Sequence, residues 1–268
     1  MAGGKCWLIL IMKKIKKILL VIGIGLLVSI VVAVMVVGLF LGKIVKAGME
    51  TAGPKITQTT LTVDAVDVSL LSGSAAVKNL VVGSPAGYHA PNAISIGLAA
   101  VSVNPTSVLA DKIVVKSVRV ESPEITFEGS LSGNNLSKIL DNVNGVAKNG
   151  GPESTDKTVA ASGRPGKKIE VDDFLITGAK VHGTLILFGG REVTLPALVL
   201  PDIHLTDLGK GPEGITAMDL TRLVLNEVVS DTLKAVENTA GNLGKDAGKT
   251  VGAGVDKITS GLGGLFKK

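Results

Sequence analysis

The feature that most constrains this chain is an apolar run without a charged residue, from Ile18 to Gly42. Four lysines between residues 13 and 17 precede the run, and Lys43 follows it. A helix needs about 20 apolar residues to cross the hydrocarbon layer of a membrane, so this run is long enough to span it with some tilt. Because flanking basic residues stay in the cytoplasm, we expect residues 1–17 there and the chain from Lys43 onward on the other side.

The anchor carries large aliphatic and aromatic side chains that would face lipid. We expect these to be Ile18, Leu19, Leu20, Val21, Leu26, Leu27, Val36, Val37, Leu39 and Phe40. A cleaved signal peptide is the alternative, with a small-residue cleavage site at residues 45–47, but its apolar core would be only about 7–15 residues long. Both interpretations export residues 48–268. The sequence from Met12 onward reads as a typical basic start, which suggests Met12 as the natural first residue.

Composition excludes several classes of partner and site. The net charge of +5 equals the charge of the five lysines before the apolar run, so the exported part is close to neutral. Aromatic residues make up 3% of the chain, which gives little support to a nucleic-acid-binding surface. The one cysteine is Cys6, so the exported part has neither disulfides nor thiolate metal ligands. We therefore expect no nucleic acid among the partners.

The apolar run, together with the composition and periodicity of the residues after it, predicts an α+β fold. This fold has an N-terminal transmembrane helix, a twisted, curved and mostly antiparallel β-sheet, and a C-terminal amphipathic helix. We expect a tether over residues 43–55 and a β domain over residues 56–208, rich in Val and Thr. Its residues 145–168 are polar and rich in Gly and Ser, and predict a mobile insert. Within residues 56–70 the apolar positions change parity between Val63 and Val66, which predicts a β-bulge.

The C-terminal part has helical periodicity. Residues 209–240 predict an amphipathic helix, and Thr216 with Asp219 resembles a capping box at its start. Residues 241–268 keep the same periodicity but contain eight glycines, each of which disfavours a helix by about 1 kcal/mol. This tail is either an amphipathic helix that lies on a surface or a disordered segment.

Motifs for catalysis are missing from the sequence. His89, His182 and His204 are far apart, and none has the spacing of a metal-binding pair. A glycine-rich segment at residues 244–250 is one residue short of a phosphate-binding loop and follows no strand. The sequence also contains no Gly-x-Ser-x-Gly motif. We therefore expect a protein that is not an enzyme and that has no cofactor and no metal.

The segment from Asn79 to Ala110 has no Asp, Glu, Lys or Arg. Strands with one wet face normally carry charges there, so this segment is either shielded on both faces or lines an apolar cavity. The candidate lining residues are Leu80, Val82, Ile94, Ile96, Leu98, Val101 and Val103.

Two short motifs follow the anchor in a recognisable order. The first is VDVSLLSGSAAVKNLVVGSPAGYHAPNAISIG, in which a Gly-Ser turn separates two strands and a loop with Pro85, Gly87 and Tyr88 follows. The second is VRVESPEITFEG, with Pro123 at its centre, followed by Asn134, Asn135 and Leu136 before a helix. In this order the chain, from Met12 to about Leu208, resembles the AsmA-like family of single-pass inner-membrane proteins with periplasmic β domains.

The resemblance implies a function in the bacterial envelope. Family members are associated with outer-membrane assembly and with lipid movement along a curved, apolar β groove. We therefore expect an inner-membrane protein with a cytoplasmic N-terminus and a periplasmic β domain, which binds phospholipid and other envelope proteins. The alternative is a structural or adaptor protein whose own C-terminal helix fills the concave face of the sheet, which is an ordinary α+β packing.

Overall fold

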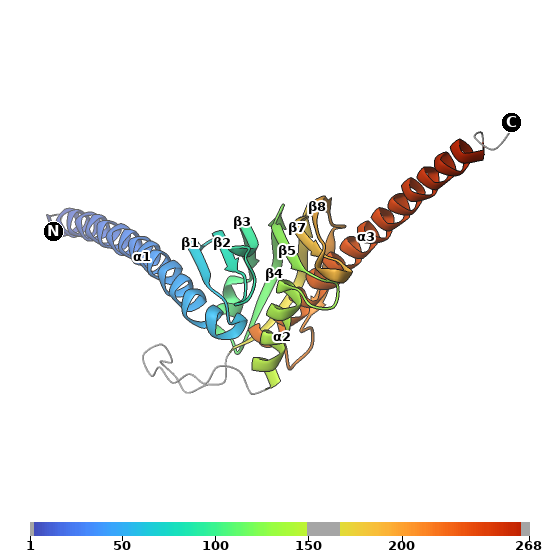
Figure 1. The fold of residues 1–268 in the computed structure, drawn as a ribbon. Coiled ribbons are helices and arrows are strands. Elements are labelled where there is room, and N and C mark those ends of the chain that lie inside the picture. The colour runs from blue at the N-terminus through green and yellow to red at the C-terminus, as the bar shows by residue number, and fades with distance from the viewer. Residues whose placement is uncertain (1–2, 149–166, 264–268) are drawn as a thin grey trace.

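The computed structural model describes residues 3–148 and 167–263, so most of the predicted insert at residues 145–168 lies outside the described residues. Figure 1 shows a curled β-sheet with helices on one face and a long helix leaving it at each terminus. The chain is thus an α+β protein, as predicted.

The first helix, α1, is continuous from Gly3 to Thr57 and includes the residues that were expected to form a tether. Two of its glycines, Gly42 and Gly53, lie against the sheet: a Cβ atom on Gly53 would come within 2.6 Å of the Leu61 side chain. Close packing of small residues thus offsets their low helix propensity. The helix ends where Gln58, with a positive φ of 55°, donates its amide to the carbonyl of Pro54 at 2.9 Å.

Among the residues that the structure describes, no helix reaches the length and apolar character required of a membrane span.

Within the described residues, nine strands form one mixed sheet, in which six of the strand pairings are antiparallel and two are parallel. The strands are β1 (Leu61–Ser69), β2 (Ser74–Gly83), β3 (Asn92–Val103), β4 (Lys112–Glu121), β5 (Glu124–Gly129), β6 (Lys168–Thr177), β7 (Lys180–Ile186), β8 (Glu192–Val199) and β9 (Ile203–Leu208). The remaining elements are the helices α2 (Asn135–Lys148) and α3 (Ala217–Gly263) and the short 3-10 turns η1 (Pro105–Leu109) and η2 (Phe188–Gly190).

Three pairs of strands, β4 with β5, β6 with β7 and β8 with β9, are each one long strand with a short interruption. Backbone hydrogen bonds continue across the interruptions. The amide of Ser122 donates to the carbonyl of Thr177 at 2.8 Å, and the amide of Lys180 donates to Pro123 at 2.9 Å. The sheet is therefore built from six long strands, of which the last three are interrupted at the same level.

The interruptions belong to a crease that crosses the whole sheet. In a regular strand successive side chains alternate between the faces. Here two consecutive residues of every long strand lie on the outer face at one shared register, and apolar inner residues flank them on both sides. The outer pairs are Asp64–Ala65, Lys78–Asn79, Gly97–Leu98, Glu121–Ser122, Thr177–Gly178 and Pro201–Asp202.

The crease replaces the predicted bulge in β1. The pairing of β1 with β2 has the same register on both sides of Asp64, so neither strand contains an extra residue. Instead both strands change parity together, and Asn79, Ser122 and Gly178 reach the required bend with positive φ angles of 48°, 48° and 62°. The side-chain amide of Asn79 also donates to the carboxylate of Asp64 at 2.6 Å. The crease curls the sheet toward its apolar face.

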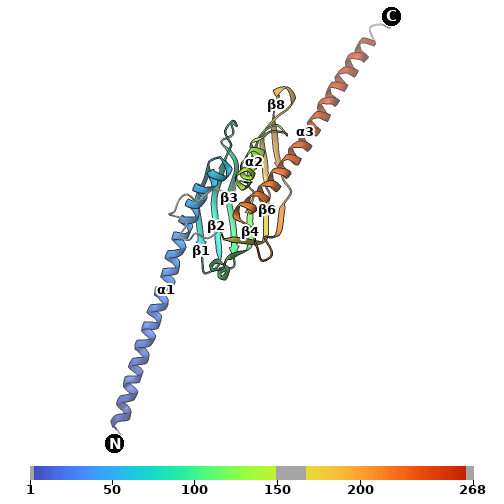
Figure 2. The ribbon, with the colours of Figure 1, turned by 90° about the horizontal axis from the view of Figure 1, so that it is seen from below.

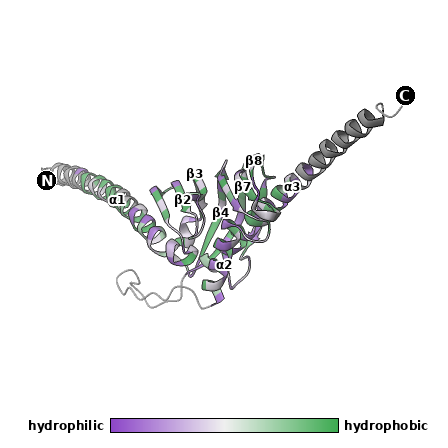
Figure 3. Ribbon diagram, in the orientation of Figure 1, coloured by the Kyte–Doolittle hydropathy of each residue, from purple (hydrophilic) through white to green (hydrophobic). Residues whose placement is uncertain are grey.

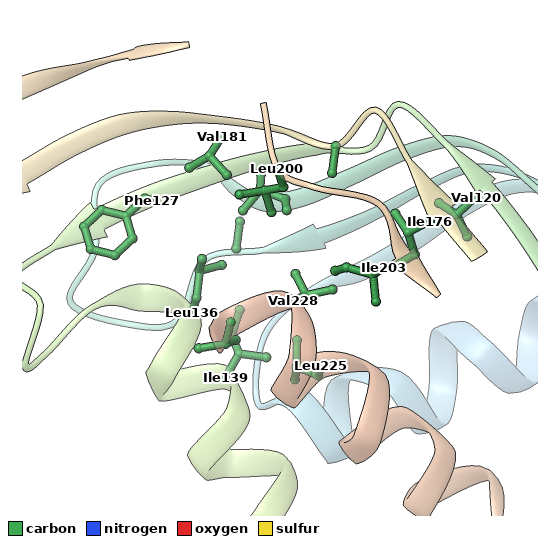
Figure 4. Close-up of a cluster of buried hydrophobic side chains, with 14 of the residues drawn as sticks. Val120, Phe127, Leu136, Ile139, Ile176, Val181, Leu200, Ile203, Leu225 and Val228 are labelled. Atoms are coloured by element: carbon green, nitrogen blue, oxygen red, sulfur yellow. The ribbon is translucent and has the colours of Figure 1, made fainter. Parts of the chain in front are cut away.

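Helices α2 and α3 lie on the inner face of the curled sheet. Figure 4 shows Leu136 and Ile139 of α2, with Leu225 and Val228 of α3, pointing at the strands. All four side chains are buried, as is Phe127 on β5. The predicted capping box starts α3, because the amide of Asp219 donates to the hydroxyl of Thr216 at 3.0 Å. The helix continues to Gly263, beyond the predicted end at residue 240.

Candidate functional site: an apolar cavity under the crease

A cavity of about 630 Å³ remains between the inner face of the sheet, α1 and α3. The sheet wall is formed by inner residues on both sides of the crease, among them Ile96 and Pro123 on one side and Val120 and Ile176 on the other. The change of parity at the crease makes both groups face inward. The bend that curls the sheet therefore also brings the two halves of the wall together.

Helix α1 supplies a second wall with Val45, Met49, Ala52 and Ile56. These residues are four, three and four positions apart, which places them on one face of a helix. The wall belongs to the segment that follows the apolar run without a break in the helix. A ligand that occupies the cavity would therefore contact the part of α1 that continues from the predicted anchor.

Helix α3 closes the opposite side with Leu220, Val224, Leu225 and Val228, and α2 adds Ile139. The side chains on the face of α3 that packs on the sheet thus have two environments. Some of its side chains are buried in the core, and others face an open volume. Helix α3 lies in the concavity but does not fill it.

The lining is apolar throughout the described part of the chain, where no charged side chain reaches the cavity. Its two hydroxyls belong to Thr57 and Thr221, and both donate within their own helices, to Gly53 at 3.0 Å and to Ala217 at 2.9 Å. The walls therefore offer van der Waals contact to an apolar ligand. The volume lies within the range of about 300–1,000 Å³ that is usual for ligand pockets.

Residues 42–50 of α1 contact the edge of β1 that does not pair with β2. The amide of Val63 donates to Glu50 at 3.1 Å, and the ammonium of Lys46 donates to the carbonyls of Val63 and Asp64, the latter at 3.0 Å. A Cβ atom on Gly42 would lie 2.1 Å from the carbonyl oxygen of Val66. The helix thus covers an edge whose backbone groups would otherwise remain open to pairing with another strand.

The residues of the second family motif tie α2 to β5. Asn134 caps the helix by accepting the amide of Ser137 at 2.8 Å. The side chain of Asn135 accepts the amide of Glu128 at 3.0 Å and donates to the carbonyl of Thr126 at 2.7 Å. Leu136 is buried in the core. These residues position α2 at one end of the cavity rather than contacting its interior.

Glu128 on β5 binds the loop of the first family motif through hydrogen bonds. Its carboxylate accepts the amides of His89 and Ala90 at 2.8 and 2.6 Å, and the His89 ring at 2.9 Å. Partial burial alone would raise the pKa of Glu128, but these donors outweigh it and lower the pKa below its ordinary value. Within the same loop, Pro85 is buried and Gly87 has a positive φ of 96°. The pKa of Tyr88 is raised by burial and by the nearby charge of Glu128.

The outer face of the sheet carries charge instead. Arg119 on β4 and His204 on β9 both contact the carboxylate of Asp173 on β6, the histidine at 2.6 Å. Hydrogen bonds from Arg119 and then from His204 lower the pKa of Asp173. Within the described residues, no group of three or more His, Cys, Asp and Glu side chains is placed to hold a metal ion.

The structure distributes the candidate lining residues over three environments. Leu80, Val82, Ile94 and Ile96 lie together on the wall of the cavity. Val101 and Val103, beyond the crease, are half-buried and pack against the hydrophobic core. Leu98 differs from the prediction: it is 47% exposed on the outer face, because it is one of the two consecutive outward residues of β3. Strict alternation from Ile96 had placed it inside.

The predicted anchor residues lie along α1, where those with described side chains are exposed: Leu20, Val21, Leu26, Leu27, Val36, Val37 and Phe40. The side chains of Ile18, Leu19 and Leu39 lie outside the described residues. Sequence reasoning missed the wall formed by Val45, Met49, Ala52 and Ile56. Their helical spacing is a visible signal, but the nearby glycines and Pro54 suggested a tether.

The chain is similar to a known protein family. The model described as the AsmA family matches residues 12–184, which is more than half of the chain. A search of curated proteins found no significant match.

Proposed function

Since this chain belongs to the AsmA family, we propose that it is a membrane-anchored envelope protein that binds the hydrocarbon chains of a lipid in the cavity under the crease. The anchor is the run from Ile18 to Gly42, with the N-terminus in the cytoplasm and the sheet in the periplasm of a bacterium. The protein carries out no catalysis, and phospholipid of the inner membrane is its ligand. Figure 3 shows hydrophobic residues along the part of α1 that projects from the sheet.

The observation that supports this proposal is the cavity of about 630 Å³, which has no charged lining residue in the described chain. A volume of this kind is costly to leave empty, because its walls lack van der Waals partners. Water would find few hydrogen-bonding groups there. A hydrocarbon chain supplies the missing contacts, and the α1 wall at Val45 follows closely on the end of the anchor at Gly42.

The second candidate is an adaptor in which α3 packs on the concave face of the sheet as part of the core and the remaining cavity holds no ligand. It is favoured by the burial of Leu225, Val228 and Val229 of α3 in the core. An adaptor of this kind would recruit envelope proteins and would contain no lipid. The two candidates differ in what the cavity holds, and this can be measured directly.

Native mass spectrometry of the gently solubilised full chain tests the choice. We expect a phospholipid to remain bound, and the variant Ile96→Trp to lose it because the larger ring occupies the cavity. The matched control is Leu98→Trp, two residues along the same strand on the outer face, which should retain the lipid. A natural chain that is free of lipid would support the adaptor instead, and equal retention by the two variants would mean that the lipid does not lie in the cavity.

Topology has a separate test. An alkaline phosphatase fused after Lys268 should be active, because that enzyme folds only in the oxidising periplasm. A fluorescent reporter that matures only in the cytoplasm should stay dark at the same position. The opposite pattern would contradict the proposed orientation without bearing on the cavity.

A further inference from the structure

One corner of the sheet, which we call the uncharged corner, consists of the β1–β2 turn (residues 70–73) and the start of the β3–β4 connection (residues 104–110). The sequence has no charged residue from Val68 to Val77, or from Asn79 to Ala110. Charged residues lie beside the corner at the same end of the sheet: Asp111 and Lys112 follow it in the chain, and the ammonium of Lys167 donates to the carbonyl of Val108 within it. Only part of the uncharged segment lines the cavity, so the cavity does not account for this corner.

The β1–β2 turn is held firmly and presents a leucine. The amide of Val103 donates to the carbonyl of Gly73 at 2.6 Å, and Gly73 has a positive φ of 63°. A Cβ atom on Gly73 would lie 2.3 Å from the carbonyl oxygen of Val103. At the tip of this turn Leu71 is 72% exposed. A single exposed leucine is ordinary on a protein surface, so its position relative to the proposed anchor decides what it can contact.

The alignment of α1 with β1 indicates which surface this is. From Glu50 back to Gly42, α1 passes Val63 and then Val66, so the helix toward its N-terminus and β1 toward its C-terminus run the same way. Gly42 is the last residue of the uncharged run. Val66 therefore lies level with the outer end of the proposed anchor, and the rest of β1 extends toward the membrane.

The lengths are consistent with contact. Five residues separate Val66 from Leu71, which corresponds to at most about 17 Å of extended chain at about 3.3 Å per residue. The headgroup layer on each side of a bilayer is about 5–8 Å deep. Figure 2 shows α1 extending past the ends of β1 and β2 and diverging from the strands as it does so. The uncharged corner thus reaches the headgroup layer even where the helix diverges from the strand.

We propose that the uncharged corner is a lipid-contact surface and that Leu71 inserts into the outer leaflet beside the anchor. This inference rests on the anchor of the proposed function, but not on lipid binding in the cavity. The residues of the corner carry no charge that would have to be desolvated on insertion, and the neighbouring Lys167, whose ammonium contacts Val108, can stay among the headgroups. The contact holds the sheet at a fixed height, with the α1 wall of the cavity opening at the membrane surface.

The chain offers a matched control at its other end. Leu131 is followed by Ser132 and Gly133, just as Leu71 is followed by Ser72 and Gly73, and it is 42% exposed. It lies in the turn after β5, at the end of the sheet away from the anchor. The two leucines therefore share a local sequence and differ in their distance from the proposed membrane.

The test uses the full chain in vesicles of phosphatidylethanolamine and phosphatidylglycerol. In a Cys6→Ser background, Leu71→Cys and Leu131→Cys are each labelled with an environment-sensitive fluorophore. We expect the probe at residue 71 to show a blue-shifted, several-fold brighter emission that spin-labelled lipid quenches, and the probe at residue 131 to report water.

Equal emission from the two probes would overturn the inference, and so would a blue shift at residue 71 that spin-labelled lipid does not quench, since that indicates a protein partner. Alkaline extraction of the same vesicles separates the two proposals. A chain that is removed by alkali lacks the anchor, whereas a chain that resists alkali with a water-exposed probe at residue 71 contradicts the corner contact alone.

Discussion

The inner and outer faces of the sheet are built from the same strands but stabilised in different ways. The inner face buries side chains such as Phe127, Val181 and Ile125, each at most 1% exposed. On the outer face neighbouring strands are joined by ion pairs, for example Lys78 with Asp67 at 2.7 Å. Exposed ion pairs contribute at most about 1 kcal/mol, whereas burying one large apolar side chain contributes about 1.5–3 kcal/mol. The stability of the fold therefore lies on the inner face.

The crease makes this separation possible in a bent sheet. Without it, a strand that alternates strictly would keep the same parity along its length, and one half of its apolar residues would point away from a curled core. Two consecutive outward residues in each strand correct the parity at a single register. The comparison of the two faces can therefore be tested by changes on each face and at the crease itself.

The largest difference should appear between Phe127→Ala and Thr126→Ala, which are neighbours on opposite faces of β5. We expect Phe127→Ala to lower the free energy of unfolding by about 3–5 kcal/mol, since it leaves a cavity in the core. Thr126→Ala should change it by less than about 0.5 kcal/mol, as for most surface substitutions. Pulse proteolysis in a urea series, with the full chain in mild detergent, measures both. Similar losses would mean that the faces are not separated as described.

A smaller effect is expected at the crease. Gly178 has a positive φ of 62°, and a Cβ atom there would lie 3.2 Å from the hydroxyl of Ser122. Gly178→Ala should therefore destabilise the chain by about 1–2 kcal/mol, the price of a left-handed conformation for a residue with a side chain. Gly97 lies in the same row with open space around it. Gly97→Ala should be neutral or stabilise by up to about 1 kcal/mol in the same urea series.

Next in size is Glu128→Gln, which tests a polar contact that fixes a loop to the outer face. Glu128 has a pKa below its ordinary value of 4.5. The stabilisation by its charge is therefore complete above that value and is lost as the pH falls through the lower pKa of the folded state. We expect the variant to lose about 1 kcal/mol at neutral pH, since hydrogen bonds to a charged group are stronger than neutral ones.

The pH profile distinguishes this contact from a general effect of acid. Between neutral pH and the acid range the natural chain should lose stability below about pH 4.5, and the gap to Glu128→Gln should close there. The change Glu124→Gln, at the exposed start of the same strand, is the control and should leave the profile unchanged. A gap that persists at low pH would show that the charge of Glu128 is not the cause.

Much of the fold could be predicted from the sequence because its signals are local. The composition rich in Val and Thr predicted a β domain over residues 56–208, and the capping pattern at Thr216 predicted the start of α3. The order of short motifs predicted the family, which the match over residues 12–184 confirms. These features depend on neighbours in the chain.

The remaining features depend on contacts between distant segments. Gly48, Gly53 and Pro54 predict a tether by propensity, and only the edge of β1 that α1 covers explains why the segment is helical. The crease is likewise a property of six strands together, so the parity change in β1 looked like an isolated bulge. Leu98 lies on the outer face for the same reason, because it is one of the two consecutive outward residues of β3 at the crease. Four residues of the sheet wall, Leu80, Val82, Ile94 and Ile96, were thus predicted, and the α1 wall was not.

The smallest expected effect is also the most direct test of the crease. Leu98→Gln should change the free energy of unfolding by less than about 0.5 kcal/mol, because Leu98 is 47% exposed and its neighbours in the row are exposed too. Ile96→Gln, on the cavity side of the same strand, should lower it by about 1–3 kcal/mol, since its amide has no partner there. Strict alternation would put residues 96 and 98 on one face, and the two changes would then be equally destabilising. A difference between them therefore shows that the two faces exchange at the crease within β3 itself, where neither a proline nor a positive φ marks the bend.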